Sequence, residues 1–149
     1  MTSTSRNEAS SPLLLSSGAS SVLVDDGTLA SKVAGQFDKV LEMIGTTTLQ
    51  DSLKCTREGG IVCVTGIVGN QWMLDAMNPM DFIPSAVCLT AYSGGPDDFM
   101  RTPLEEIAGQ VERGEMQVQI GKVYQLEEIV EAHRMMESNK AGGKIVVLT

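Results

Sequence analysis

The stretch FDKVLEMIGTTTLQDSLKCTREGGIVCVTGIVG, residues 37–69, contains two apolar runs separated by a polar, helix-like segment. The runs Lys39–Ile44 and Ile61–Ile67 are rich in Val and Ile and nearly continuous, which is typical of strands buried on both faces. Leu49–Arg57 lies between them, follows Thr48 as a candidate helix cap, and stops at a pair of glycines. This strand–helix–strand order predicts a right-handed crossover and therefore a parallel sheet.

Shorter apolar runs extend the same pattern along the chain. Ser21–Val24, Ala86–Tyr92 and Lys144–Leu148 are predicted as further strands, and Thr28–Ala34 as a short helix. Strands that alternate with helices at this spacing are typical of an α/β fold.

Two stronger helices are expected in the second half. One begins at Pro103, with Thr102 and Glu105 as a capping box. The other spans Leu126–Ser138, where apolar residues repeat at helical spacing.

The charge balance excludes several classes of partner. The 149 residues include 11 Lys and Arg but 19 Asp and Glu, which gives a net charge of −8. Nucleic acids and anionic membrane surfaces are therefore not expected partners, because both require clustered positive charge. No stretch approaches the roughly 18 apolar residues of a transmembrane helix.

The three cysteines, Cys55, Cys63 and Cys88, are widely spaced and form no C-x-x-C pair. The sequence therefore predicts no zinc site of the knuckle type. Cys63 and Cys88 lie within apolar runs and are expected to be buried, inert thiols. Free thiols favour a reducing, cytoplasmic setting.

Small and acidic residues follow the first four predicted strands. Parallel sheets bind ligands at the carboxyl ends of their strands, and small residues let a flat ligand approach the backbone. A second explanation, that these glycines only make turns, stays open. The segments are Asp25-Asp26-Gly27, Gly45-Thr46-Thr47, Gly66-Ile67-Val68-Gly69 and Ser93-Gly94-Gly95.

Residues 37–69 resemble the middle of the cofactor domain of the medium-chain dehydrogenase/reductase superfamily. The similar branch is the quinone-oxidoreductase-like one, often labelled zinc-type alcohol dehydrogenase. The tail VYQLEEIVEAHRMMESNKAGGKIVVLT, residues 123–149, is similar to that family's C-terminal helix and strand, and GASSVLVDDG, residues 18–27, to its third cofactor-domain strand. The resemblance covers residues 7–149.

The resemblance implies an NADPH-dependent reductase of quinones, enones or related carbonyls. Ser5 and Arg6 stand where the family holds the 2′-phosphate of NADPH, and Asp25 lies near the adenine. The resemblance places Ile44, Gly45 and Thr46 beneath the ribose and nicotinamide, Gly66, Ile67 and Val68 at the carboxamide, and Ser93 at the substrate entrance. It assigns no catalytic side chain, and no zinc is expected.

The sequence departs from the family in having no Gly-rich loop before TSTSR. The expected fold is therefore α/β: a truncated Rossmann-like doubly wound parallel sheet lacking its first strand and Gly-rich loop. Unpaired strand edges and weak affinity for NADPH follow from that gap. We expect a lead-in with a remnant of the 2′-phosphate loop (1–20), a partial dinucleotide-binding domain (21–117), and a C-terminal helix and strand (118–149).

Three hypotheses follow from these patterns. The first is a reductase fragment that acts on a small carbonyl or quinone substrate only when the missing part is supplied. The second is a non-catalytic remnant that binds a nucleotide weakly or forms a homodimer through the edge strand Ala86–Tyr92. The third is an unrelated α/β binding module.

Overall fold

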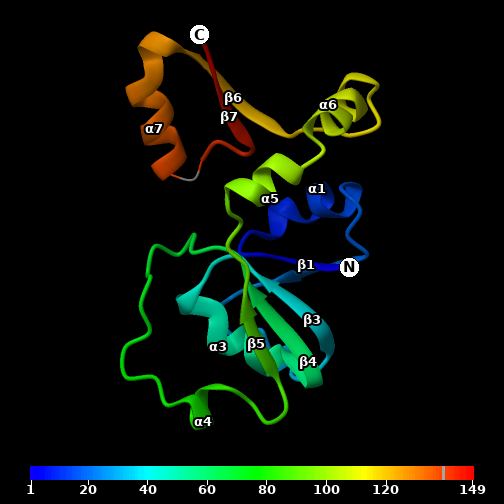
Figure 1. Cartoon of the computed structure of the whole chain (residues 1–149), viewed down its shortest axis with the longest axis vertical. Coiled ribbons are helices and arrows are strands. Elements are labelled where there is room, and N and C mark those ends of the chain that lie inside the picture. The colour runs from blue at the N-terminus through cyan, green and yellow to red at the C-terminus, as the bar shows by residue number, and fades with distance from the viewer. Residues whose placement is uncertain (139) are drawn as a thin grey trace. The chain divides into compact units, whose positions relative to one another are not determined.

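The computed structural model describes residues 1–138 and 140–149 (Figure 1). The chain divides into two compact units, Met1–Gly94 and Gly95–Thr149. Each unit is described by itself. Among the described residues, no helix combines the length and apolarity needed to cross a membrane.

The first unit opens with a parallel pair of strands, β1 (Thr2–Ser5) and β2 (Ser21–Val24). They are joined by the short helix η1 (Glu8–Ser10) and by α1 (Ser11–Ser16). Sequence interpretation missed β1 and α1 within residues 1–20, because TSTS carries no apolar signal and is recognisable as a strand only through its pairing with β2. The domain boundaries expected from sequence stay predictions.

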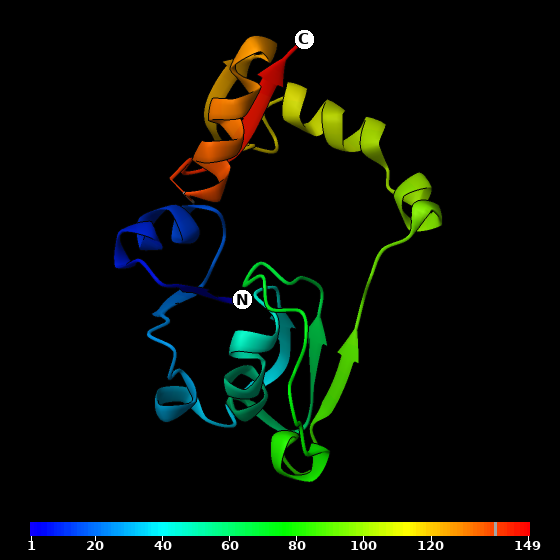
Figure 2. The ribbon, with the colours of Figure 1, turned by 90° about the vertical axis from the view of Figure 1, so that its left-hand side faces the viewer.

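A second parallel sheet holds β3 (Phe37–Glu42), β4 (Thr56–Val64) and β5 (Cys88–Ala91) in that order (Figure 2). The helix α3 (Thr46–Cys55) connects β3 to β4. Strand–helix–strand was the pattern expected for this stretch, and the parallel pairing confirms it.

The boundaries of these elements differ from the expected ones. Helix α3 begins at Thr46 and ends at Cys55, and its N-cap is Gly45 rather than Thr48. The Thr48 hydroxyl lies inside the first turn of the helix, where it donates to a carboxylate oxygen of Glu42 at 3.0 Å.

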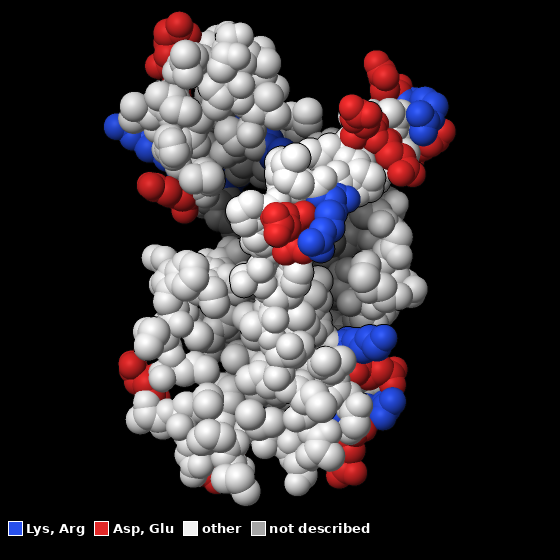
Figure 3. Space-filling view, viewed as in Figure 1, with Lys and Arg blue, Asp and Glu red and all other residues white. Residues whose placement is uncertain are grey.

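The core of the first unit lies on one face of the β3–β4–β5 sheet. Leu49 and Leu53 of α3 pack there with Val62 of β4 and with Val87, which precedes β5. The short helices α2 (Ala30–Val33) and α4 (Pro79–Phe82) lie in the connections before β3 and before β5. On the face seen in Figure 3, charged side chains are sparse over β5 and the connection that precedes it.

The cysteines are less buried than the apolar runs suggested. Cys88 is exposed and Cys63 is partly exposed, whereas Cys55 at the end of α3 is buried. Burial of both Cys63 and Cys88 was therefore a wrong prediction. The reason is that their side chains lie on the sheet face that α3 does not cover.

The two sheets of the first unit correspond to one interrupted sheet. Doubly wound folds have the strand order 3-2-1-4-5-6. The pair β2–β1 supplies positions 3 and 2, and β3–β4–β5 supplies positions 4, 5 and 6. Among the described residues no strand occupies position 1, which agrees with the Rossmann-like sheet expected without its first strand.

The second unit contains α5 (Pro96–Arg101), α6 (Leu104–Glu112), β6 (Ile120–Gln125), η2 (Leu126–Glu128), α7 (Ile129–Glu137) and β7 (Lys144–Leu148). Strands β6 and β7 pair in parallel, with α7 between them along the chain. Sequence interpretation found α7 and β7 but missed α5 and β6.

The expected capping box at the start of α6 was wrong. The N-cap is Pro103 and no side chain caps this end. The Thr102 hydroxyl instead donates to the carbonyl of Asp98 at 3.0 Å, so Thr102 ends α5.

Candidate functional site

The carboxyl ends of β1 and β2 bring two predicted site residues together. The backbone nitrogen of Asp25 donates to the carbonyl oxygen of Ser5 at 2.8 Å. The Ser5 hydroxyl accepts from the backbone nitrogen of Asn7 at 3.1 Å and is half-buried, whereas Arg6 between them is exposed. A hydroxyl and an exposed guanidinium at a strand end suit an anionic ligand.

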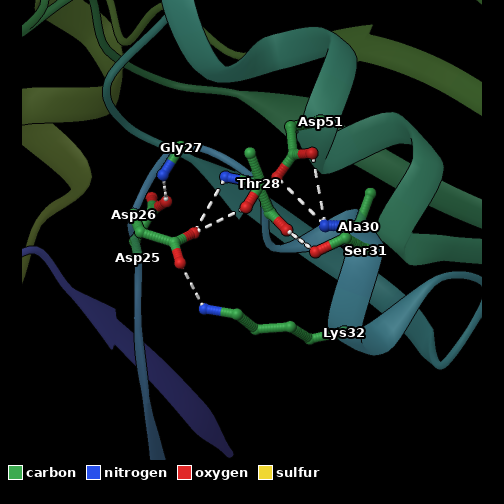
Figure 4. Close-up of polar contacts among 8 residues, drawn as sticks. All are labelled: Asp25, Asp26, Gly27, Thr28, Ala30, Ser31, Lys32 and Asp51. Atoms are coloured by element: carbon green, nitrogen blue, oxygen red, sulfur yellow. Dashed lines mark hydrogen bonds and ion pairs between the residues drawn. The ribbon is translucent and has the colours of Figure 1, made fainter.

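The loop that follows β2 is held by its own side chains (Figure 4). Asp25 accepts a hydrogen bond from the backbone nitrogen of Gly27 at 2.8 Å. Asp26 accepts from Lys32 at 2.6 Å and from the hydroxyl of Thr28 at 2.8 Å. These partners, Lys32 first, lower the pKa of Asp26 from 3.8 to about 2. The loop after β2 is therefore ordered by its own contacts.

Helix α2, which follows this loop, is attached to α3. The backbone nitrogen of Ala30 donates to both carboxylate oxygens of Asp51, each at 3.2 Å. The nitrogens of Gly35 and Gln36 donate to the carbonyls of Lys54 and Cys55 at 3.0 and 2.9 Å. The segment between β2 and β3 is thus tied to the helix that supports the second sheet.

A buried carboxylate organises the turn between β3 and α3. Glu42 is only 4% exposed, and one of its oxygens accepts from the backbone nitrogens of Ile44 and Gly45 at 2.8 and 3.1 Å. The same oxygen accepts from Thr48, and the second oxygen accepts from the Ser52 hydroxyl. Four donors satisfy the buried charge, as a buried ionised group requires.

The turn after β4 packs directly on this turn. The nitrogens of Val68 and Gly69 donate to the carbonyls of Met43 and Ile44 at 3.3 and 2.8 Å. The glycines permit this approach, since a Cβ added to Gly66 would lie 2.7 Å from the Met43 carbonyl oxygen. These glycines therefore do more than make turns, because they allow two loops at the sheet's carboxyl edge to touch.

The structure thus brings the predicted residues together in two groups. One group consists of Ser5, Arg6 and Asp25 on the β1–β2 piece. The other consists of Ile44, Gly45, Thr46, Gly66, Ile67 and Val68 on the β3–β4 piece, where Thr46 also donates to the carbonyl of Gln71. Ser93 is exposed and follows Tyr92, whose nitrogen donates to the Val64 carbonyl at 2.9 Å.

Sequence reasoning missed the residues that hold the second group in shape. Glu42 is the only acidic residue within the apolar run Lys39–Ile44, and that isolation was the available signal. A charge in the middle of a buried strand requires partners nearby. Thr48 and Ser52, at helical spacing on α3, supply them.

Parallel strands with intervening helices, and site candidates at the strands' carboxyl ends, define a Rossmann-like α/β domain. A family profile described as zinc-binding dehydrogenase matches residues 17–147. The chain belongs to this family, which agrees with the resemblance seen in its sequence.

One curated relative and two solved structures illustrate the similarity of this chain to known proteins. A quinone oxidoreductase from Lama guanicoe is 29% identical over 116 residues, which cover 75% of this chain and 34% of the relative. The structure of a Pseudomonas syringae quinone oxidoreductase superposes with a TM-score of 0.79 at 16% identity, over 99% of this chain and 48% of that one. A mycobacterial protein complexed with NADPH gives a TM-score of 0.75 at 22% identity, with coverage of 99% and 48%.

The chain therefore spans about a third of the length of the curated relatives it matches. The family's description implies zinc, and the described side chains do not fit a zinc site. Within residues 1–138 and 140–149, no three His, Cys, Asp or Glu side chains are grouped to hold a metal ion. We assign no metal-dependent step to this chain.

Proposed function

We propose that the chain is the nucleotide-binding part of an NADPH-dependent oxidoreductase that transfers hydride to a quinone, enone or related carbonyl. The family match and the quinone oxidoreductase relatives support this proposal. The reduced nicotinamide supplies the hydride when it is bound, and the protein positions and shields it. A cytoplasmic setting is proposed with it, on the basis of the free cysteines.

The contact between Ser5 and Asp25 carries the proposal. This backbone hydrogen bond joins the ends of two parallel strands, so Ser5, the exposed Arg6 and Asp25 all lie at the carboxyl edge of the β1–β2 pair. The guanidinium of Arg6 would pair with the 2′-phosphate, and the Asp25 loop would border the adenine.

The residues of the β3–β4 piece would bind the nicotinamide half of the cofactor. Ile44, Gly45 and Thr46 would pass beneath the ribose and nicotinamide, and their shape is held by Glu42. Backbone groups of Gly66, Ile67 and Val68 would bind the carboxamide, and Ser93 would border the substrate. Hydride transfer from a nicotinamide depends mainly on how the cofactor and the substrate are positioned, and it does not require a protein side chain that exchanges a proton.

Nucleotide titration tests the proposal. NADPH should bind the full chain more tightly than NADH, measured by nicotinamide fluorescence, and Arg6→Ala should abolish the difference. Arg101→Ala, which removes an exposed arginine from α5, is the matched control and should preserve the preference. Equal binding of the two nucleotides by the unmodified chain would contradict the assignment of Arg6.

A second candidate function is a non-catalytic module that dimerises. Strand β5 pairs only with β4 among the described residues, so its outer edge is available for a second copy. The expected interface is the edge strand Ala86–Tyr92. A dimer that forms by light scattering but binds neither nucleotide would favour this function over the reductase.

A further inference from the structure

Two cysteines share one face of the β3–β4–β5 sheet. Cys63 of β4 pairs with Thr90 of the neighbouring strand β5 (Figure 1). Ile61, two residues before Cys63, pairs with Cys88. Paired residues share a face and so do residues two apart in a strand, so both thiols lie opposite the buried Val62. Cys88 is exposed and Cys63 partly exposed on this face, where two soft sulfur ligands are therefore accessible together.

The separation of the two thiols is too large for a disulfide but suits a bridging ion. They lie on the diagonal of a rectangle whose sides are one strand spacing and two residues, so their Cα atoms are roughly 8 Å apart. A disulfide requires Cα atoms within about 7 Å. A thiolate–metal–thiolate bridge spans two bonds of about 2.3 Å each, and staggered rotamers that turn both side chains toward the diagonal bring the sulfurs to that separation.

The number and type of these ligands point to monovalent copper. In the part of the chain that the structure describes, no three His, Cys, Asp or Glu side chains are grouped for a metal ion. A structural zinc site needs four ligands, and calcium and magnesium take oxygen ligands. Thiolates favour Cu(I), which two ligands satisfy in a linear arrangement. Reducing conditions that keep the thiols free also keep copper monovalent.

The neighbours of the two cysteines suit such a complex. Ile61 and Thr90 occupy the other two corners of the rectangle, so one side is apolar and the other carries a hydroxyl that can donate to a thiolate. Cu(I) with two thiolates carries one net negative charge. Lys39, an exposed residue that pairs with Ile61 on the same face, supplies a positive charge diagonal to Cys63.

We propose that Cys63 and Cys88 bind a single Cu(I) ion as a two-coordinate dithiolate site. Each thiol releases its proton as its Cu–S bond forms, so binding releases two protons and copper keeps its oxidation state. No oxidant or reductant takes part. Neither cysteine belongs to the residues proposed to hold the nucleotide, so the copper site stands independently of the proposed function.

Competition for copper tests the site. The full chain is added to the coloured bicinchoninate complex of Cu(I), and loss of colour measures transfer. The unmodified chain should take up a single Cu(I), whereas Cys63→Ser and Cys88→Ser should each abolish the transfer. Cys55→Ala, which removes the buried thiol at the end of α3, is the matched control and should retain it. Circular dichroism checks that each variant is folded, and equal uptake by Cys63→Ser and Cys55→Ala would overturn the proposal.

A second measurement needs no substitution in the site. Cu(I) should slow the alkylation of Cys63 and Cys88 by iodoacetamide together and leave the rate of Cys55 unchanged. Protection of Cys88 alone would contradict an ion shared by the two thiols. Lys39→Gln should weaken copper binding by about twofold, the effect of one charge at roughly 8 Å in water.

The remaining outcomes concern what holds the ion. X-ray absorption of the loaded chain should show two sulfur neighbours around copper, and a shell of nitrogen or oxygen atoms would overturn the proposal. Sedimentation should give the same mass for the chain with and without copper. A copper-dependent dimer that survives in Cys63→Ser would instead assign the ion to Cys88 of two copies, and would also overturn the proposal.

Discussion

The carboxylate of Glu42 accepts a hydrogen bond from the backbone nitrogen of Gly45 at 3.1 Å. This contact ties the last residue of β3 to the N-cap of α3, across a turn in which Gly45 adopts φ = 101°. The same carboxylate oxygen also receives Ile44 and Thr48. One buried charge therefore sets the geometry of the turn that would lie beneath the cofactor.

Replacing Glu42 should destabilise the first unit. Glu42→Gln removes the negative charge that the four donors face and replaces one of the two acceptor oxygens by an NH₂ group, at a cost of about 1–3 kcal/mol in the free energy of unfolding. Urea denaturation followed by circular dichroism measures the change. Glu58→Gln alters an exposed glutamate of β4 and should change stability by less than about 0.5 kcal/mol. Equal effects of the two variants would show that the buried network contributes nothing.

Substitutions of Gly45 and Gly27 distinguish the cost of backbone strain at positive φ from the cost of steric crowding by an added Cβ atom. Both have positive φ, 101° and 88°, but only a Cβ on Gly45 would crowd neighbours, at 3.0 Å from the Ile67 Cδ1 atom. Gly45→Ala should therefore lose more stability than Gly27→Ala, which should lose about 1 kcal/mol for the backbone alone. Thermal unfolding of both variants checks the order. A larger loss for Gly27→Ala would mean that the β4 turn does not rest on Gly45.

Sequence alone predicted the elements whose signals are local. The Val- and Ile-rich runs of β3 and β4 and the apolar run of β5 identify those strands without tertiary information. By contrast, TSTS becomes β1 only because β2 lies beside it. Cys88 was expected to be buried because its neighbours are apolar, but exposure depends on what covers the sheet. Glu42 was missed because its partners Thr48 and Ser52 are joined to it by the fold.

The ion pair between Lys32 and Asp26 should be visible in the acid titration of the chain. The folded-state pKa of Asp26 is lowered from 3.8 to about 2, so its stabilisation is complete above pH 3.8 and is lost as the pH falls from 3.8 to 2. Lys32→Met should return the pKa toward 3.8, measured by carboxyl NMR titration. Lys54→Met, at an exposed position on α3, is the control. A pKa still near 2 in Lys32→Met would show that the ion pair does not lower it.

The cysteines should react with iodoacetamide in an order set by their exposure. Burial, with lesser contributions from Asp51 and Asp25, raises the pKa of the Cys55 thiol to about 11, so almost no thiolate forms at pH 8. Cys88 is exposed and should be alkylated first, while Cys55 should react only on unfolding in urea. Peptide mass spectrometry over time gives the three rates. Cys88→Ser should remove the fast phase alone, and fast labelling of Cys55 in the folded chain would contradict the packing of α3 against the sheet.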